Sequence, residues 1–264
     1  MKIGFIGCGN MAGAMMDGIA ASGIVNSSDI YASDMDESKL NAKKEKLGIN
    51  VSTDNLVVTK EADILFLAVK PQYYDVVTEE IKGYITSDMI IVTIAPGKTL
   101  KYMADRIGSD VKVIRTMPNT PAMVGEGMMG MCPNENVTAE DLGTVRKICN
   151  SFGETEVITE NLMDVVTAVS GSSPAYVFLF IEAMADAAVA GGMARDKAYK
   201  FAAQAVLGSA KMVLETGKHP GELKDIVCSP AGTTIQAVRV LEERGMRSAV
   251  FEAMMKCLDI SRGL

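Results

Sequence analysis

The chain opens on Lys2-Ile3-Gly4-Phe5-Ile6-Gly7-Cys8-Gly9-Asn10-Met11-Ala12, and this stretch decides the fold. Residues 2–6 are a short apolar run typical of a buried strand, and residues 10–22 can continue as a helix. Between them, residues 7–12 fit the pattern G-x-G-x-x-G/A, which marks the turn from strand to helix in dinucleotide-binding domains. The sequence therefore predicts a strand, a glycine loop and a helix at its start.

The small residues of this loop have distinct physical roles. Gly7 permits the tight turn, Gly9 has no side chain to keep a pyrophosphate from the backbone, and Ala12 lets the helix lie close to the sheet. The helix N-terminus adds unpaired N–H groups and a partial positive charge, which suit a phosphate. Asp34 follows the loop by about twenty residues, where an acid that binds the adenosine ribose is expected. A glycine turn that binds nothing is the alternative.

Length and composition predict a folded protein of one large or two ordinary domains. The 264 residues include 48% hydrophobic and 22% charged side chains, which favours a substantial core. The net charge of −7 and the absence of a basic run argue against nucleic-acid binding. The five scattered cysteines form no CxxC pattern and accompany a single histidine, so we expect reduced thiols and no metal site. Because a strand begins at Lys2, no cleavable signal peptide is expected, and we predict a cytoplasmic protein.

The first part of the chain alternates between strand and helix patterns. This alternation predicts an α/β Rossmann-type N-terminal domain over residues 1–160, with a doubly wound, mostly parallel sheet. The expected strands are residues 2–6, 30–33, 64–69, 89–93, 111–116, 128–131 and 154–157. The expected helices are residues 10–22, 38–47, 72–81, 100–107 and 139–152.

The second part shows no strand patterns and predicts an all-α C-terminal dimerisation domain over residues 161–264. Many of its segments are apolar on more than one face, so a second copy of the chain would help to bury them. Residues 175–194 resemble a membrane span, but Glu182 and Asp186 would be costly in lipid, and a buried helix is preferred. The expected helices are residues 173–190, 195–215, 221–227, 231–244 and 246–262.

Three turns follow expected strands at the carboxyl edge of the sheet, where ligands bind in open α/β folds. They are residues 70–71, 94–97 and 116–121. The last, Thr116-Met117-Pro118-Asn119-Thr120-Pro121, is rigid and polar and would suit contact with a nicotinamide or a substrate. Each could also be a plain connector.

The helical domain adds two polar clusters, residues 170–175 and 228–235. Ser173 and Pro174 predict a helix start, with Ser173 as the N-cap. Both clusters would present hydroxyl and N–H groups at helix N-termini, which suit a small carboxylate. Plain helix capping explains Ser229 alone, but less readily the following Thr233-Thr234 pair.

Groups for acid–base chemistry are scarce. The only histidine, His219, stands in an expected loop, and the sequence offers no convincing Ser/His/Asp triad and no G-x-S-x-G motif. This scarcity favours a substrate that arrives already protonated, such as a cyclic imine, which accepts hydride with little help. The enzyme would then need positioning, a dry pocket and one hydroxyl donor.

A series of motifs resembles the pyrroline-5-carboxylate reductase family, in order and along nearly the whole chain. The motif around Ser229–Thr234 is the most specific, whereas the glycine loop is shared by many dehydrogenases. The motifs are residues 5–12, 66–71, 115–121, 170–176, 219–225 and 229–234.

The resemblance implies NAD(P)H-dependent reduction of 1-pyrroline-5-carboxylate to L-proline, the last step of proline biosynthesis. Residues 6–11 would contact the cofactor pyrophosphate and residues 68–71 its nicotinamide half. Ser33 would lie near the adenosine ribose and Asn55 near the adenine. The implied cofactor-binding residues are Ile6, Gly7, Cys8, Gly9, Asn10, Met11, Ser33, Asn55, Ala68, Val69, Lys70 and Pro71.

The resemblance also implies a substrate site between subunits. Thr234 would hydrogen-bond the ring nitrogen and donate a proton, as the catalytic residue. The backbone around Gly232 and Thr233, with Ser229, would hold the carboxylate. The family often carries a glycine-rich form of this motif, where this chain has Ala231 and Thr233. The implied assembly is a homodimer, often a decamer of five dimers, with no nucleic-acid or membrane partner.

The cofactor is NADPH or NADH, and the residues leave the choice open. Asp34 favours the free 2′-hydroxyl of NADH, whereas Ser33 could bond a 2′-phosphate, with no arginine beside it. Family habit favours NADPH slightly.

Two other functions remain open at this point. A relative acting on a hydroxy acid or another imine would use a lysine of the helical domain, such as Lys197, Lys200 or Lys211. A nucleotide-sensing protein would bind the dinucleotide without chemistry.

Overall fold

The structure is a computed structural model in which residues 1–263 are described. The chain forms two compact units. The sheet unit comprises Met1–Ser172 together with the C-terminal residues from Leu258 onward, and the helical unit comprises Ser173–Cys257. The segment between residue 160 and Ser172 belongs to the sheet unit because its helix α7 (Met163–Val166) packs on two strands of the sheet.

The sheet unit is built on one eight-stranded sheet with the order β3-β2-β1-β4-β5-β6-β7-β8. The first six strands pair in parallel in the Rossmann order, β7 runs antiparallel to β6, and β8 runs parallel to β7. The strands are β1 (Ile3–Ile6), β2 (Ile30–Ser33), β3 (Asn50–Ser52), β4 (Ile64–Leu67), β5 (Ile90–Thr93), β6 (Lys112–Met117), β7 (Gly127–Pro133) and β8 (Gly153–Val157).

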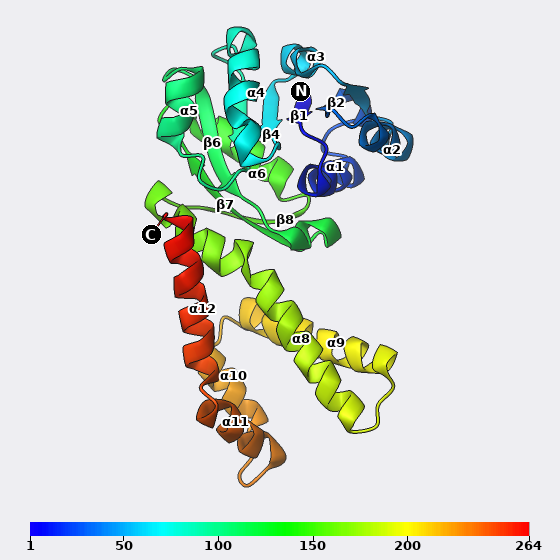
Figure 1. Ribbon diagram of the computed structural model, residues 1–264, viewed down its shortest axis with the longest axis vertical. Coiled ribbons are helices and arrows are strands. Elements are labelled where there is room, and N and C mark those ends of the chain that lie inside the picture. The colour runs from blue at the N-terminus through cyan, green and yellow to red at the C-terminus, as the bar shows by residue number, and fades with distance from the viewer. Residues whose placement is uncertain (264) are drawn as a thin grey trace. The chain divides into compact units, whose positions relative to one another are not determined.

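Helices cover the sheet (Figure 1), and each face has its own hydrophobic core. Alternate residues of a strand point to opposite faces, so Phe5 and Phe66 stack in one core with ring centroids 4.7 Å apart, while Ile6 and Leu67 enter the other. The predicted doubly wound, mostly parallel sheet is therefore confirmed. The helices are α1 (Asn10–Ser22), α2 (Glu37–Leu47), α3 (Asn55–Glu61), α4 (Tyr74–Ile81), α5 (Leu100–Ile107), α6 (Ala139–Cys149) and α7.

The helix termini follow capping rules. Asp36 begins α2 by accepting the N–H of Ser38 at 3.0 Å, and Gly48 ends it in the left-handed region. Thr138 and Asp141 form a reciprocal capping box at the start of α6. Asp54 caps α3 in the same way as Asp36 caps α2, although α3 was not expected from the sequence.

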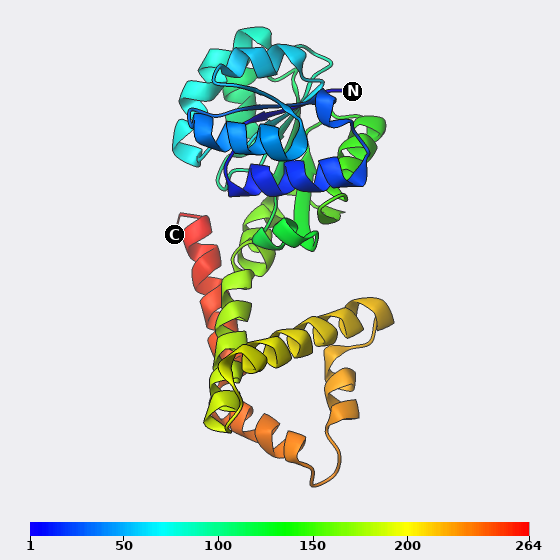
Figure 2. The ribbon, with the colours of Figure 1, turned by 90° about the vertical axis from the view of Figure 1, so that its right-hand side faces the viewer.

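The helical unit contains five helices: α8 (Ser173–Ala190), α9 (Arg195–Thr216), α10 (Pro220–Val227), α11 (Thr233–Glu243) and α12 (Met246–Ser261), of which the last residues belong to the sheet unit. Helices α8 and α9 pack against each other, and Figure 2 shows α9, α10 and α11 spread apart. None of residues 220–227 or 233–243 is buried. The all-helical prediction is confirmed.

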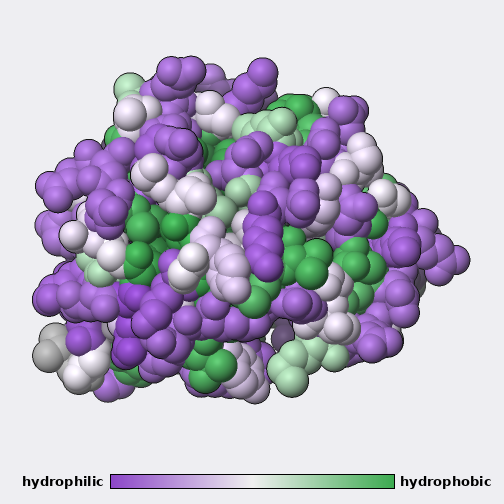
Figure 3. All heavy atoms as spheres, turned by 90° about the horizontal axis from the view of Figure 1, so that it is seen from above, coloured by the Kyte–Doolittle hydropathy of each residue, from purple (hydrophilic) through white to green (hydrophobic). Residues whose placement is uncertain are grey.

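Large apolar side chains of the helical unit are exposed in the single chain. Examples on different helices are Phe178 at 62%, Leu214 at 83% and Phe251 at 67% exposure. By contrast, the part of the molecular surface seen in Figure 3 is mostly hydrophilic, with separate apolar patches. The exposed apolar faces of these helices agree with the expectation that a second copy of the chain covers them.

One helical run, Glu160–Ala190, is long and apolar enough to span a membrane by length and composition alone. Four acidic residues lie within it, Glu160, Asp164, Glu182 and Asp186, and Asp186 forms an ion pair with Arg195 of α9. Since a helix that becomes buried between subunits would have the same composition, this run gives only weak support for a membrane location.

Candidate active site

Gly7 makes the turn out of β1 and leaves no room for a side chain. Its φ is +101°, a region that favours glycine, and its N–H donates to the carbonyl of Ser33 at 2.7 Å. A Cβ at this position would stand 2.7 Å from the carbonyl oxygen of Ala68, which follows β4. The loop therefore lies against the end of β4, at the point where the strand order reverses.

Gly9 leaves the N-terminus of α1 open. Chain neighbours aside, no atom of residues 1–263 lies within 4 Å of where a Cβ on Gly9 would stand. No side chain of the described residues caps this helix, and Gly9 and Asn10 are exposed. A cavity of about 290 Å³ lies beside the loop, lined in part by Gly9, Asn10 and Lys39. This cradle of free backbone N–H groups fits the pyrophosphate of a dinucleotide.

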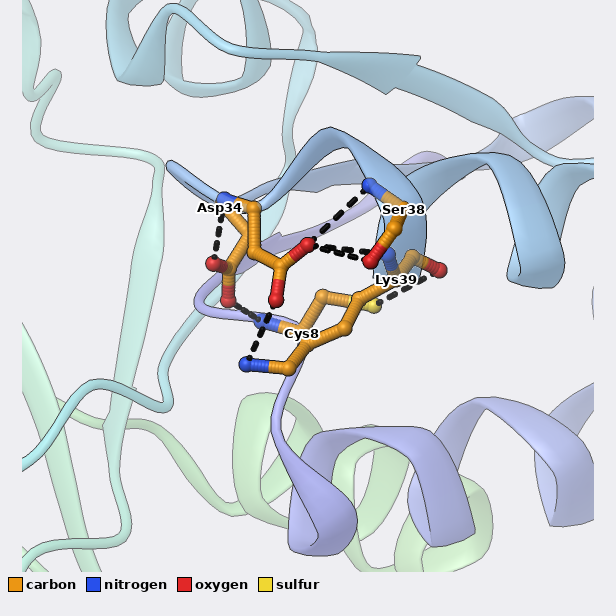
Figure 4. A network of polar contacts seen from close by, with 5 residues as sticks. Cys8, Asp34, Ser38 and Lys39 are labelled. Atoms are coloured by element: carbon orange, nitrogen blue, oxygen red, sulfur yellow. Dashed lines mark hydrogen bonds and ion pairs between the residues drawn. The ribbon is translucent and has the colours of Figure 1, made fainter.

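Asp34 binds the glycine loop itself (Figure 4). Its Oδ2 accepts the N–H of Cys8 at 2.7 Å, and its Oδ1 accepts the N–H of Asp36 at 2.9 Å. Lys39 pairs with Asp36 at 3.2 Å in the same network. Burial, assisted by the charge of Asp34, raises the pKa of the Cys8 thiol, so this thiol stays protonated. Asp34 thus shapes the loop in addition to its predicted position at the ribose.

Ser33 and Asn55, both predicted near the adenosine, lie together. The Ser33 hydroxyl is fully buried at the end of β2 and donates to Asn55 Oδ1 at 2.7 Å. The Asn55 amide donates in turn to Glu80 at 2.8 Å. A 2′-phosphate bound by Ser33 would have to compete with Asn55 for the hydroxyl proton.

Residues 68–71, which were predicted to contact the nicotinamide half, follow β4 beside the glycine loop. The N–H of Ala68 donates to the carbonyl of Ile6 at 2.8 Å, which places the end of β4 next to the end of β1. Ala68 and Val69 are half-buried, whereas Lys70 and Pro71 are exposed. The structure thus brings residues 6–11 and 68–71 to one edge of the sheet.

Tyr74, which sequence reasoning missed, supports this edge from within. It is fully buried, and its hydroxyl donates to the carbonyl of Leu67 at 2.6 Å and lies 2.8 Å from Thr93 Oγ1. It thereby joins the carboxyl ends of β4 and β5. Burial raises the pKa of the Tyr74 phenol far above its usual value, so the group stays neutral. The only sequence feature that could have indicated this role was the presence of a tyrosine shortly after Lys70-Pro71.

Replacing Tyr74 by phenylalanine is expected to lower the free energy of unfolding by about 1–3 kcal/mol, since the Leu67 carbonyl and Thr93 hydroxyl lose a buried partner. Urea unfolding measures the change. Tyr73→Phe is the matched control, because Tyr73 is 53% exposed, and it should stay within about 0.5 kcal/mol of the parent. Equal stability of both variants would contradict the supporting role.

The polar cluster at residues 170–175 does not form an open helix N-terminus, and the prediction that Ser173 is an N-cap is wrong. The residues before α8 are already helical, forming a π-helical turn over Thr167–Gly171. The N–H of Ser172 donates to the carbonyl of Thr167 at 2.9 Å. A backbone N–H that the preceding turn already uses is not available to a substrate carboxylate.

The second cluster, Ser229–Thr234, does form an open helix N-terminus in the helical unit. Gly232 is the N-cap of α11, no described side chain caps that helix, and the Gly232 N–H donates to the carbonyl of Ser229 at 3.0 Å. A Cβ on Gly232 would stand 2.3 Å from the Ser229 hydroxyl, so a larger residue there would require the Ser229 side chain to move. Thr234 is half-buried one residue into the helix, and Thr233 is exposed.

Ala231 holds this loop in a rare conformation. Its φ is +58°, the only positive value at a non-glycine position within residues 1–263. Such backbone strain, on the order of 1 kcal/mol, clusters at ligand-binding sites. An alanine therefore stands at a position whose backbone conformation favours glycine.

The remaining candidates have structural positions. His219 caps α10, because its Nδ1 accepts the N–H of Gly221 at 3.0 Å. Lys197, Lys200 and Lys211 are exposed, and Lys211 pairs with Glu215 at 3.3 Å. Among residues 1–263 no group of three or more His, Cys, Asp or Glu side chains could hold a metal ion.

A Rossmann-type sheet unit with an open pyrophosphate cradle, followed by an all-helical unit, defines a two-domain nicotinamide-dependent oxidoreductase. Residues 2–97 match the family described as NADP oxidoreductase, coenzyme F420-dependent, and residues 160–264 match pyrroline-5-carboxylate reductase dimerisation. The chain is 56% identical over 263 residues to the pyrroline-5-carboxylate reductase of Escherichia coli (strain K12), covering 100% of this chain and 98% of that protein. The chain belongs to the pyrroline-5-carboxylate reductase family.

Solved structures agree with this assignment. A pyrroline-5-carboxylate reductase from Coxiella burnetii has a TM-score of 0.93 at 34% identity, covering 99% of this chain and 97% of that one. The Plasmodium falciparum pyrroline carboxylate reductase with NADP bound has a TM-score of 0.90 at 33% identity, covering 100% and 97%. The family resemblance and the fold class predicted from the sequence are confirmed.

Proposed function

We propose that this chain reduces 1-pyrroline-5-carboxylate to L-proline with NADPH or NADH, the last step of proline biosynthesis. The observation that carries the proposal is the 56% identity to a pyrroline-5-carboxylate reductase over the whole chain. The open α1 N-terminus supports a nicotinamide dinucleotide as the reductant.

The sheet unit would hold the cofactor, which supplies a hydride when bound. Gly7 and Gly9 clear the backbone for the pyrophosphate, and Asp34 fixes the loop between them through the Cys8 N–H. The adenosine would lie toward Ser33 and Asn55, and the nicotinamide half toward residues 68–71. NADP in the Plasmodium falciparum relative favours NADPH, whereas Asp34 is suited to NADH, so both are substrates to test.

The helical unit would hold the substrate. The N–H groups at the start of α11, with the Ser229 hydroxyl, would bind its carboxylate, and the helix dipole favours this charge. The Thr234 hydroxyl would hydrogen-bond the ring nitrogen. Because a cyclic iminium already carries its proton near neutral pH, no histidine is required. The ring N–H of the iminium would donate to the Thr234 hydroxyl, and Thr234 would donate a proton only to substrate that arrives as the neutral imine.

The working form would be at least a homodimer in the cytoplasm, with substrate held between subunits, and five dimers could assemble further into a decamer. The exposed apolar side chains of α8, α9 and α12 support this assembly.

Replacing both Phe178 and Phe251 by glutamate is expected to shift the protein toward monomer, because two charges would enter an apolar interface. Light scattering after size-exclusion chromatography measures the mass. Val76→Glu is the control, since Val76 is 70% exposed on the sheet unit and should leave the mass unchanged. A monomeric parent protein would contradict the proposal.

The direct test of function is oxidation of NADH and NADPH, followed at 340 nm, with purified protein and 1-pyrroline-5-carboxylate. We expect cofactor oxidation that depends on this substrate and proline as the product. Hydroxy acids and larger cyclic imines serve as comparison substrates. Tight binding of cofactor with no reduction of any imine would instead indicate a nucleotide sensor.

A further inference from the structure

The Asn119 side chain joins two polar motifs that have no assigned role, residues 116–121 and residues 170–175. The Asn119 amide, in the loop after β6, donates from Nδ2 to the carbonyl of Ser170 at 3.0 Å, across 51 residues of sequence. Its Oδ1 accepts the N–H of Met128 at the start of β7 at 2.8 Å. Asn119 is only 8% exposed, so both ends of its amide are committed inside the sheet unit.

The carbonyl that Asn119 binds lacks its ordinary helical donor. In an α-helix the carbonyl of Ser170 would accept the N–H four residues later, but that residue is Pro174, which has none. Ser170 is half-buried, and a carbonyl that is fully buried without a donor costs about 1–3 kcal/mol, which sets an upper bound here. The Asn119 amide supplies the hydrogen bond that Pro174 cannot give.

The same place carries a π-helical turn, which is rare and frequently marks functional sites. The turn spans Thr167–Gly171 and closes with the Ser172 N–H on the Thr167 carbonyl, a spacing of five residues. Gly171 lies against Met117, since a Cβ there would stand 2.7 Å from the Met117 methyl carbon. Directly after it, at Ser173, the chain enters the helical unit.

We propose that Asn119 is a positioning residue that holds this π-helical turn in the form from which α8 continues. Its role differs from the nicotinamide or substrate contact that the sequence suggested for its loop, because the buried amide directs its nitrogen to the Ser170 carbonyl and its oxygen to the Met128 N–H. The kinetic part of the test rests on the proposed function, since turnover would require the two units to cooperate. Hydrogen exchange supplies a readout that does not depend on the proposed function.

Asn119→Asp keeps an oxygen for the Met128 N–H but turns a carboxylate toward the Ser170 carbonyl. At pH 8 we expect kcat/KM for 1-pyrroline-5-carboxylate to fall by about tenfold to a hundredfold. The Kd for NADPH, measured by fluorescence titration, should change by less than about threefold, because Gly7 and Gly9 are untouched.

Lowering the pH should rescue this variant. Burial raises the pKa of the introduced carboxyl, and once protonated it can again donate to Ser170 while its other oxygen accepts from Met128. The ratio of variant to parent activity should therefore rise between pH 8 and pH 5.5, roughly within the range of raised carboxyl pKa values. Asn119→Leu has no proton to gain, so its ratio should stay flat. A flat ratio for Asn119→Asp, or full activity at pH 8, would overturn the proposal.

Amide hydrogen exchange tests the turn directly in the full-length protein. We expect the amides of residues 167–172 to exchange at least about tenfold faster in Asn119→Leu than in the parent, with exchange in β1 and α1 unchanged. Unchanged exchange at residues 167–172 would overturn the positioning role. Faster exchange there in a protein that reduces no imine would uphold it while rejecting the reductase function.

Discussion

Thr234→Ala is expected to lower kcat for 1-pyrroline-5-carboxylate by about a hundredfold, because the hydroxyl that we propose to hold the ring nitrogen is lost. Thr234 lies half-buried at the start of α11, beside the uncapped helix N-terminus. The Kd for NADPH should be unchanged, since the glycine loop belongs to the sheet unit. Steady-state kinetics combined with a cofactor titration separates the two quantities.

Thr234→Ser provides the matched control for this result. Serine keeps the hydroxyl and removes only a methyl group, so we expect it to retain activity within about tenfold of the parent. Thr234→Val keeps the shape and removes the hydroxyl, and it should behave like Thr234→Ala. Normal turnover in Thr234→Val would remove the hydroxyl from the mechanism.

Gly7→Ala is expected to abolish cofactor binding and to destabilise the protein. The new Cβ would stand 2.7 Å from the Ala68 carbonyl oxygen, and an alanine would have to adopt φ +101°. Strain and collision together should cost at least about 2 kcal/mol of unfolding free energy and raise the Kd for NADPH by about a hundredfold or more. Thermal unfolding and fluorescence titration measure the two effects.

Gly9→Ala separates binding from folding at the same loop. Gly9 has ordinary backbone angles and open space where a Cβ would stand, so its variant should remain as stable as the parent within about 1 kcal/mol. The methyl group would nevertheless occupy the approach of the pyrophosphate and weaken NADPH binding about tenfold or more. Gly83→Ala, also in open space but far along the chain, should change neither quantity. Unimpaired NADPH binding in Gly9→Ala would place the pyrophosphate elsewhere.

The repeating elements of the sheet unit could be predicted because their patterns are strong. Helices α1 and α5 begin and end at the predicted residues, and so does β2. The pair β3 and α3 was missed for a physical reason. Strand β3 is short, polar and only partly buried, so it has no apolar run, and α3 carries Leu56-Val57-Val58-Thr59, which reads as a strand. The cap at Asp54 was the signal that could have corrected the interpretation.

The candidate site was predictable where the backbone conformation requires a particular residue. It was not predictable where a side chain has more than one possible hydrogen-bond partner. Gly7 and Gly9 follow from the glycine pattern, and Gly232 from the resemblance. Asp34 could equally serve a ribose or the loop, and only the structure shows that it accepts the Cys8 N–H. Helix α8 begins at the predicted residue, but Ser173 is its first helical residue and not its N-cap, because the π-helical turn before it leaves no sequence pattern.

The C-terminal residues from Leu258 onward return to the sheet unit, where the Ser261 hydroxyl donates to Asp164 at 2.8 Å. The helical unit is therefore inserted between two segments of the sheet unit, and the chain connects it to that unit at both of its ends. A single protease cut inside it would leave both fragments tied to the same sheet unit, one by the peptide bond after Ser172 and the other through the returning end of α12. Shortening the chain from its C-terminus would strip a piece from the sheet unit before it reached the helical unit.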